Sequence, residues 1–140
     1  FDDTAEVVAR MRGLGVQSVN LDVLYGLPHQ SIDSIRATIR QILSIRPNRV
    51  ALFGYAHVPW MARRQVMIPS DKLPRPEERL RLFEAARELF VADGYAEIGI
   101  DHFALPTDGL AIAAREGRHL RARGGHARTL RQDSGHGGIL

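Results

Sequence analysis

The stretch that decides the fold is residues 19–55, VNLDVLYGLPHQSIDSIRATIRQILSIRPNRVALFGY. Apolar and polar residues alternate at its start, which predicts a strand over residues 17–25 with Asp22 on the polar face. After Ser31, which can cap a helix, isoleucines recur at helical spacing, and residues 49–55 form a nearly continuous apolar run. A strand, a helix and a strand in this order favour a parallel sheet with a right-handed crossover.

The flanking sequence continues this alternation. Thr4 can cap a first helix, and Pro76 suits the first position of another. Residues 95–101 predict a third strand, so the chain is expected to be an α/β protein of alternating helices and parallel strands. Because the chain starts with a helix and holds only three such strands, we interpret residues 1–118 as one domain that forms part of a barrel or a doubly wound sheet.

The composition is that of a globular protein. Of 140 residues, 44% are apolar and 25% are charged, and no apolar run approaches the roughly 20 residues of a membrane span. The chain has no cysteine, which excludes disulfides, thiolate catalysis and thiolate ligation of an iron–sulfur cluster by its own residues. This composition agrees with a reducing compartment, and we expect a cytoplasmic protein without a leader or a membrane anchor.

The basic charge is concentrated at the C-terminus. The formal net charge is +3, and residues 115–140 hold six arginines against one glutamate and one aspartate. Residues 119–140 are rich in arginine, glycine and histidine and show no hydrophobic period. We therefore expect them to be a poorly ordered tail, and their composition also resembles the out-of-frame translation of a GC-rich gene.

Polar residues stand where each predicted strand ends, which is where parallel α/β folds hold their sites. These residues are Asp22, the run Tyr55-Ala56-His57, and the pair Asp101-His102. Asp22 can accept hydrogen bonds from a ribose, or it can cap a loop or pair with an arginine. His57 can act as a base or a ligand, or as a hydrogen-bonded structural residue. Asp101 and His102 are adjacent in a predicted strand, so we expect them to face opposite sides and to form no dyad.

The loop over residues 57–75 contains three prolines and two adjacent arginines, Arg63 and Arg64. Such a pair can contact an acidic substrate, or it can be solvated without a partner. The chain lacks the glycine patterns of phosphate-binding loops and the histidine spacings of metal sites. We therefore predict no metal site in this chain and assign no catalytic residue.

Three strings resemble one enzyme family. Residues 20–28 (NLDVLYGLP) resemble the N-x-D-L-I-Y-G-L-P segment of the coproporphyrinogen branch of the radical SAM enzymes. Residues 53–59 (FGYAHVP) and 99–104 (GIDHFA) are similar to the F-N-Y-A-H-x-P and G-M-D-H-F-A segments of the oxygen-independent coproporphyrinogen III oxidases. Residues 108–117 match a further D-x-L-A-x-A-x-R-E-G type run in part, so the resemblance covers roughly residues 1–118.

The resemblance implies the second half of a partial (β/α)6 radical SAM barrel. It also implies that the parent enzyme decarboxylates two propionates of coproporphyrinogen III to vinyl groups, giving protoporphyrinogen IX. The cofactors would be a [4Fe–4S] cluster and two molecules of S-adenosylmethionine, the second of which would contact Asp22 and Ala56. The partners would be the substrate and an electron donor, and the protein would be a monomer that binds neither membrane nor nucleic acid.

The chain departs from the family pattern at both ends. It lacks the C-x-x-x-C-x-x-C cluster motif and the glycine-rich S-adenosylmethionine segment, and residues 119–140 replace an R-N-F-Q-G-Y-T type string. We therefore expect a central fragment that is inactive alone. One alternative is a haem-chaperone relative, although such proteins carry a Y-E-I-S-N-F-A type string at residues 99–104. Another is a small non-enzymatic module whose arginine-rich tail contacts nucleic acid, although that tail has no aromatic residue to stack on bases.

Overall fold

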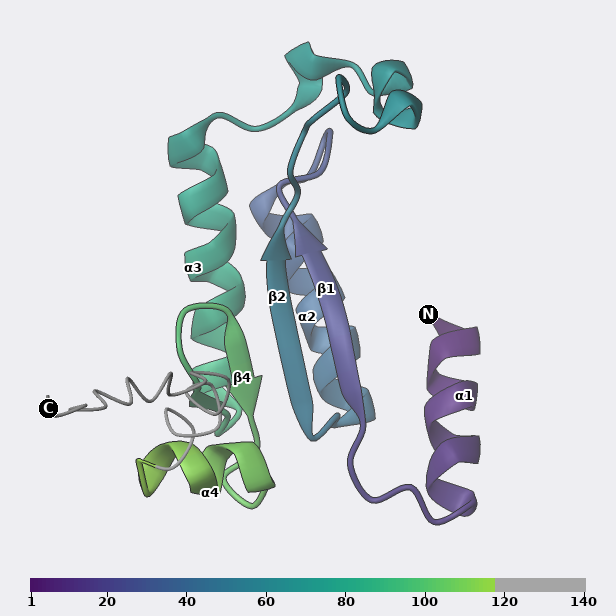
Figure 1. The fold of residues 1–140 in the computed structure, drawn as a ribbon, viewed down its shortest axis with the longest axis vertical. Helices are drawn as coiled ribbons and strands as arrows, with labels where there is room; N and C mark the ends of the chain where they lie inside the picture. The colour runs from purple at the N-terminus through teal and green to yellow at the C-terminus, as the bar shows by residue number, and fades with distance from the viewer. Residues whose placement is uncertain (118–140) are drawn as a thin grey trace, which may run out of the picture.

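The structure, a computed structural model, describes residues 1–117 and consists of one sheet with helices around it (Figure 1). The elements in chain order are α1 (Asp2–Gly13), β1 (Asn20–Tyr25), α2 (Ile32–Ile45), β2 (Arg49–Gly54), the 3-10 helices η1 (Arg63–Met67) and η2 (Ser70–Lys72), α3 (Pro76–Ala92), β3 (Ala96–Glu97), β4 (His102–Ala104) and α4 (Gly109–Arg115).

The sheet is mixed, with the strand order β1-β2-β4-β3. Strands β1 and β2 are parallel, and Asp22 lies opposite Ala51. Strand β4 is antiparallel to β2, and its His102 also lies opposite Ala51. Because paired residues share a face of the sheet, Asp22, Ala51 and His102 form one row across three strands on the same face.

The core lies between the other face of the sheet and helices α2 and α3. Helix α2 lies behind β1 and β2 in the view of Figure 1. The buried cluster consists of Val23, Ile35, Ile39, Ile42, Val50, Leu52, Leu82, Ala85, Ala86, Phe90, Tyr95 and Phe103. Within it Phe90 and Phe103 stack with ring centroids 4.8 Å apart. One face of the sheet is therefore closed by α2 and α3, whereas the opposite face carries the exposed side chains of Asn20, Asp22 and Leu24, and we call it the open face.

The helix starts follow the expected chemistry, with one exception. The Ser31 hydroxyl accepts a hydrogen bond from the Ser34 N–H at 3.1 Å and caps α2, and Pro76 opens α3 as predicted. Helix α1 begins at Asp2 instead of after Thr4, so the prediction of Thr4 as its cap was wrong. Asp2 and Asp3 place negative charge in the first turn, where it is favourable at a helix N-terminus.

The α/β class is confirmed, but the third parallel strand was wrong. Residues 95–101 do not form one strand, because the chain turns between β3 and β4. Gly99 lies at the turn with φ +80°, a left-handed conformation that glycine adopts without strain. The Ile98 N–H donates to the His102 carbonyl at 2.7 Å, which closes the hairpin and makes β4 antiparallel to β2.

The described residues bear on the expected tail and on the expected absence of a membrane span to different degrees. The tail predicted over residues 119–140, and the domain boundary before it, lie outside residues 1–117. Within residues 1–117, no helix has both the length and the apolar character needed to cross a membrane.

Candidate functional site

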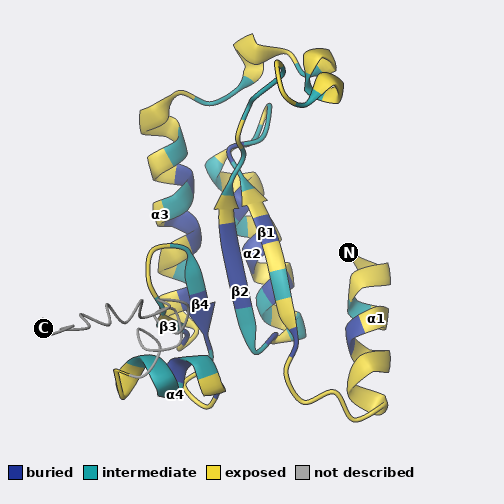
Figure 2. Cartoon of the chain, in the orientation of Figure 1, coloured by how far each residue is buried: buried dark blue, intermediate teal, exposed yellow. Residues whose placement is uncertain are grey.

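The candidate site is the open face of the sheet together with the ends of β1 and β2. Both strands end at the same edge, and the chain beyond β2 rises above that edge (Figure 1). Exposed positions alternate with half-buried or buried positions along β1 (Figure 2), and its exposed residues Asn20, Asp22 and Leu24 lie on the open face. In parallel α/β folds this edge is where ligands bind.

Asp22 presents a carboxylate on the open face. One of its oxygens, Oδ1, accepts a hydrogen bond from the Asn20 side-chain amide at 3.0 Å. Among the described residues Asp22 forms no ion pair with an arginine and caps no loop. Neither of the two structural roles considered for Asp22 therefore explains this carboxylate. Its second oxygen is available to a ligand donor such as a hydroxyl or an ammonium group.

Asp101 and His102 form a hydrogen-bonded pair, so the prediction that they form no dyad was wrong. The distance from His102 Nδ1 to Asp101 Oδ1 is 2.6 Å. The prediction failed because Asp101 lies in the bend before β4, where the alternation of side chains along a strand does not apply. His102 also meets Phe53 edge to face, with ring centroids 6.0 Å apart, and so belongs to the open face.

His57 is held from both sides in the loop beyond β2. Its Nδ1 lies 3.2 Å from the Tyr55 hydroxyl, and its Nε2 lies 3.1 Å from the Ser70 hydroxyl. Both ring nitrogens are thus engaged in joining the end of β2 to η2. This arrangement fits the structural alternative for His57 and leaves no nitrogen free for a metal or a substrate proton.

Ala56 is exposed, and its backbone is anchored by Gln65. The Gln65 amide donates to the Ala56 carbonyl at 3.1 Å and accepts from the Val58 N–H at 2.6 Å. Gln65 therefore fixes the conformation of residues 56–58, a role that the sequence analysis missed. A single glutamine in a proline-bearing loop carries no pattern from which that role can be predicted.

Asp22 and Ala56 lie at different heights along the strand direction. Ala51 is level with Asp22, and Ala56 follows five residues later. At about 3.3 Å per residue, the two positions are separated by at most about 17 Å along the strands. A ligand that touches both must be elongated, and it must contact them with different parts of its structure.

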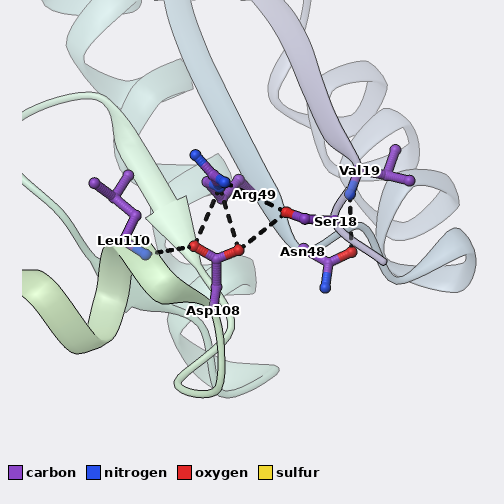
Figure 3. A network of polar contacts seen from close by, with 6 residues as sticks. All are labelled: Ser18, Val19, Asn48, Arg49, Asp108 and Leu110. Carbon is purple, nitrogen blue, oxygen red and sulfur yellow. Dashed lines mark hydrogen bonds and ion pairs between the residues drawn. The ribbon is translucent and has the colours of Figure 1, made fainter. Parts of the chain in front are cut away.

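A buried carboxylate closes the opposite end of the sheet (Figure 3). The Asp108 side chain is only 3% exposed, and Arg49 Nε lies 3.1 Å from its Oδ1. The Ser18 hydroxyl donates to Asp108 Oδ2 at 3.2 Å, and the Leu110 N–H donates to Oδ1 at 2.8 Å. Asp108 thus caps α4 and ties it to β2 and to the chain entering β1, which is a structural role.

The residues of this chain do not fit an iron–sulfur cluster. The sequence contains no cysteine, and the described residues contain no group of three or more histidine or acidic side chains that could hold a metal ion. The open face around Asp22 does fit a polar organic ligand, because within residues 1–117 this carboxylate has an amide partner and no charged one.

Comparison with known proteins identifies relatives of this chain. No family model matches the chain. It is 61% identical over 117 residues to the oxygen-independent coproporphyrinogen III oxidase of Paracoccus denitrificans (strain Pd 1222). The chain is homologous to a segment of that enzyme family. This confirms the resemblance that residues 20–28, 53–59 and 99–104 carry.

Two further relatives support the same assignment. The chain is 54% identical over 121 residues to a Cereibacter sphaeroides protein named coproporphyrinogen III oxidase, anaerobic 1. A solved structure, described as the coproporphyrinogen III oxidase (HemN) from Escherichia coli and as a radical SAM enzyme, matches with a TM-score of 0.78 and 36% identity.

The chain spans about a quarter of the length of these relatives. The matches cover 84%, 86% and 81% of this chain but only 26% of each relative. Neither curated relative is named as a haem-trafficking or nucleic-acid-binding protein, which were the two alternatives drawn from the sequence.

Proposed function

We propose that this chain supplies one part of the active-site wall of an oxygen-independent coproporphyrinogen III oxidase and is inactive without the remainder. The observation that carries the proposal is the 61% identity to the Paracoccus denitrificans enzyme over 117 residues. The parent reaction converts two propionates of coproporphyrinogen III to vinyl groups and gives protoporphyrinogen IX. Each conversion removes one hydrogen atom, one carbon dioxide and one electron from a propionate.

Asp22 and Ala56 are proposed to contact S-adenosylmethionine. When bound, this cofactor supplies the radical that removes the hydrogen atom. The carboxylate of Asp22 would accept hydrogen bonds from the ribose hydroxyls or from the ammonium group. Ala56 has no polar side chain, so its contribution is its backbone, which Gln65 holds in place. The iron–sulfur ligands of the parent enzyme would belong to residues outside this chain.

The remaining expectations follow from the same proposal. The parent enzyme would take coproporphyrinogen III and an electron donor as its partners, act as a monomer in the cytoplasm, and bind no nucleic acid. The Asp101–His102 pair would orient the imidazole on the open face, and we assign it no step in the reaction.

A chimera tests the proposed cofactor contact. In the chimera, residues 1–117 replace the matching segment of the Paracoccus denitrificans relative. Asp22→Asn keeps the size of the side chain and removes its charge. The loss of a charge-assisted hydrogen bond costs about 1.5–3 kcal/mol, so binding of S-adenosylmethionine should weaken by roughly 10- to 100-fold.

The matched control is Asp33→Asn, which changes an exposed aspartate in the first turn of α2. Equilibrium dialysis with labelled S-adenosylmethionine measures both the affinity and the number of molecules bound. Equal binding by the two variants would show that Asp22 is not a contact.

A further inference from the structure

The loop beyond β2 exposes a concentration of large apolar side chains. Trp60 is 76% exposed, Met61 79%, Val66 71% and Met67 89%. Four such residues within eight positions form an apolar surface next to the candidate site. Large exposed apolar surfaces mark places where a ligand or a partner binds.

Two arginines lie within the same surface and have no acidic partner. Arg63 and Arg64 are exposed, and their side chains form no hydrogen bond or ion pair with any other residue among 1–117. The other cations of the loop are paired, since Lys72 contacts Asp71 at 3.2 Å and Arg75 contacts Glu78 at 3.5 Å. The unbalanced positive charge of the loop is therefore confined to Arg63 and Arg64.

The 3-10 helix η1 places charge and apolar surface together. In a 3-10 helix, side chains three residues apart lie on the same side. Arg63 therefore shares a side with Val66, and Arg64 shares a side with Met67. Gln65, between them, points to the backbone of residues 56–58, so the two arginine-bearing sides face away from that anchor.

The surface is fixed close to the proposed cofactor contact. Gln65 binds the Ala56 carbonyl, and His57 joins the same segment to Ser70 of η2. The loop is therefore held to the strand ends at two points, and it rises beyond the edge at which β1 and β2 end (Figure 1). A ligand on η1 would lie beside Ala56.

We propose that Trp60, Met61 and the Arg63–Met67 helix bind the tetrapyrrole, with Arg63 and Arg64 pairing with its propionate carboxylates and the apolar side chains contacting its ring system. This proposal rests on the proposed function. The charge complementarity is specific, because the substrate combines an apolar macrocycle with several carboxylates. Arginine binds carboxylates in a planar, two-bond geometry that a solvated lysine does not provide.

The single tryptophan of the chain gives a direct readout, because Trp60 lies in this surface. The probe is coproporphyrin III, the stable oxidised tetracarboxylate, and the comparison ligand is its tetramethyl ester in the same dilute detergent. Titration of the full chain with coproporphyrin III should quench the Trp60 emission saturably. The ester should bind more weakly, because it lacks the negative charges.

The decisive variant is Arg63→Gln/Arg64→Gln, which keeps polar side chains on an exposed helix. Its affinity for coproporphyrin III should fall roughly tenfold or more, while its affinity for the ester should not change. The matched control, Arg40→Gln/Arg115→Gln, removes the same charge from exposed positions on α2 and α4 and should behave as the unmodified chain. A Met67→Ser variant should weaken binding of both ligands.

Equal affinity of the two double-arginine variants, or equal binding of acid and ester, would overturn the proposal. The chimera separates this outcome from failure of the proposed function. If the chimera forms protoporphyrinogen IX but the Arg63→Gln/Arg64→Gln change leaves its KM for coproporphyrinogen III unaltered, the surface serves another occupant, such as the remainder of the enzyme. If the chimera folds and forms no product, the proposed function itself fails.

Discussion

Removal of the Asp108 carboxylate should destabilise the fold more than any exposed charge change. Asp108→Ala deletes the cap of α4 and the buried partner of Arg49. It also removes the acceptor of the Ser18 hydroxyl. The change acts at the junction of β1, β2 and α4, so its effect should appear in the global unfolding transition.

The magnitude follows from these contacts. Loss of a helix cap costs about 1 kcal/mol, and removal of one partner of a buried ion pair costs about 3–5 kcal/mol. The Arg49 side chain is 37% exposed and can be rehydrated, which reduces the second cost. We expect a net loss of about 3 kcal/mol. Asp108→Asn keeps an acceptor for the Leu110 N–H and should lose about 2 kcal/mol.

Urea unfolding followed by circular dichroism measures this effect. With a slope of about 1.5 kcal/mol per molar urea, a loss of 3 kcal/mol lowers the midpoint by roughly 2 M. The control is Asp71→Ala, because Asp71 is exposed and its ion pair is with the exposed neighbouring Lys72. Combining Asp108→Asn with Arg49→Gln should give less than the sum of the single effects, because the two residues interact directly.

If Asp108→Ala lowers the urea midpoint no more than Asp71→Ala does, the reasoning is refuted. Strict additivity of Asp108→Asn and Arg49→Gln would refute the narrower claim that the ion pair itself carries part of the stability.

Two other predictions concern the core and the loop. Burial raises the pKa of Tyr95 to about 12, so the folded state keeps its proton between pH 10 and 12 while the unfolded state loses it. Stability should therefore fall by about 2–3 kcal/mol as the pH rises through this window, and Tyr95→Phe should remove that dependence in pH-dependent urea unfolding; an unchanged slope would contradict it. Gln65→Ala removes both the acceptor of the Val58 N–H and the donor to the Ala56 carbonyl, so amide exchange at Val58 should accelerate about tenfold relative to the control Gln41→Ala. Equal exchange in both variants would show that Gln65 does not hold the loop.

Much of the fold was predictable because its core elements have strong periodicity. The isoleucines of α2 at 35, 39 and 42 identify a single buried stripe, and the alternation of β1 places Asp22 on the open face. Periodicity failed at residues 95–101, where the turn at Gly99 outweighs a pattern that reads as one strand. The same turn moves Asp101 out of the strand and lets it meet His102.

The site was predictable only where side chains carry the chemistry. The polar face of β1 pointed to Asp22, but Ala56 offers only backbone groups and was identified from family resemblance alone. Gln65 acts through two bonds to the backbone, and such contacts depend on a loop conformation that no local pattern specifies. The partner of Asp108, Arg49, is 59 residues away in the chain, so their pairing follows from the topology of the sheet and α4.

The most direct test of the central claim is product formation by the chimera that carries residues 1–117 within the Paracoccus denitrificans relative. Incubation without oxygen, with coproporphyrinogen III, S-adenosylmethionine and a reductant, should give protoporphyrinogen IX, identified by mass after oxidation as the loss of two carboxyl groups and the gain of two vinyl groups. A chimera that folds and holds its iron–sulfur cluster but leaves all propionates intact would contradict the account.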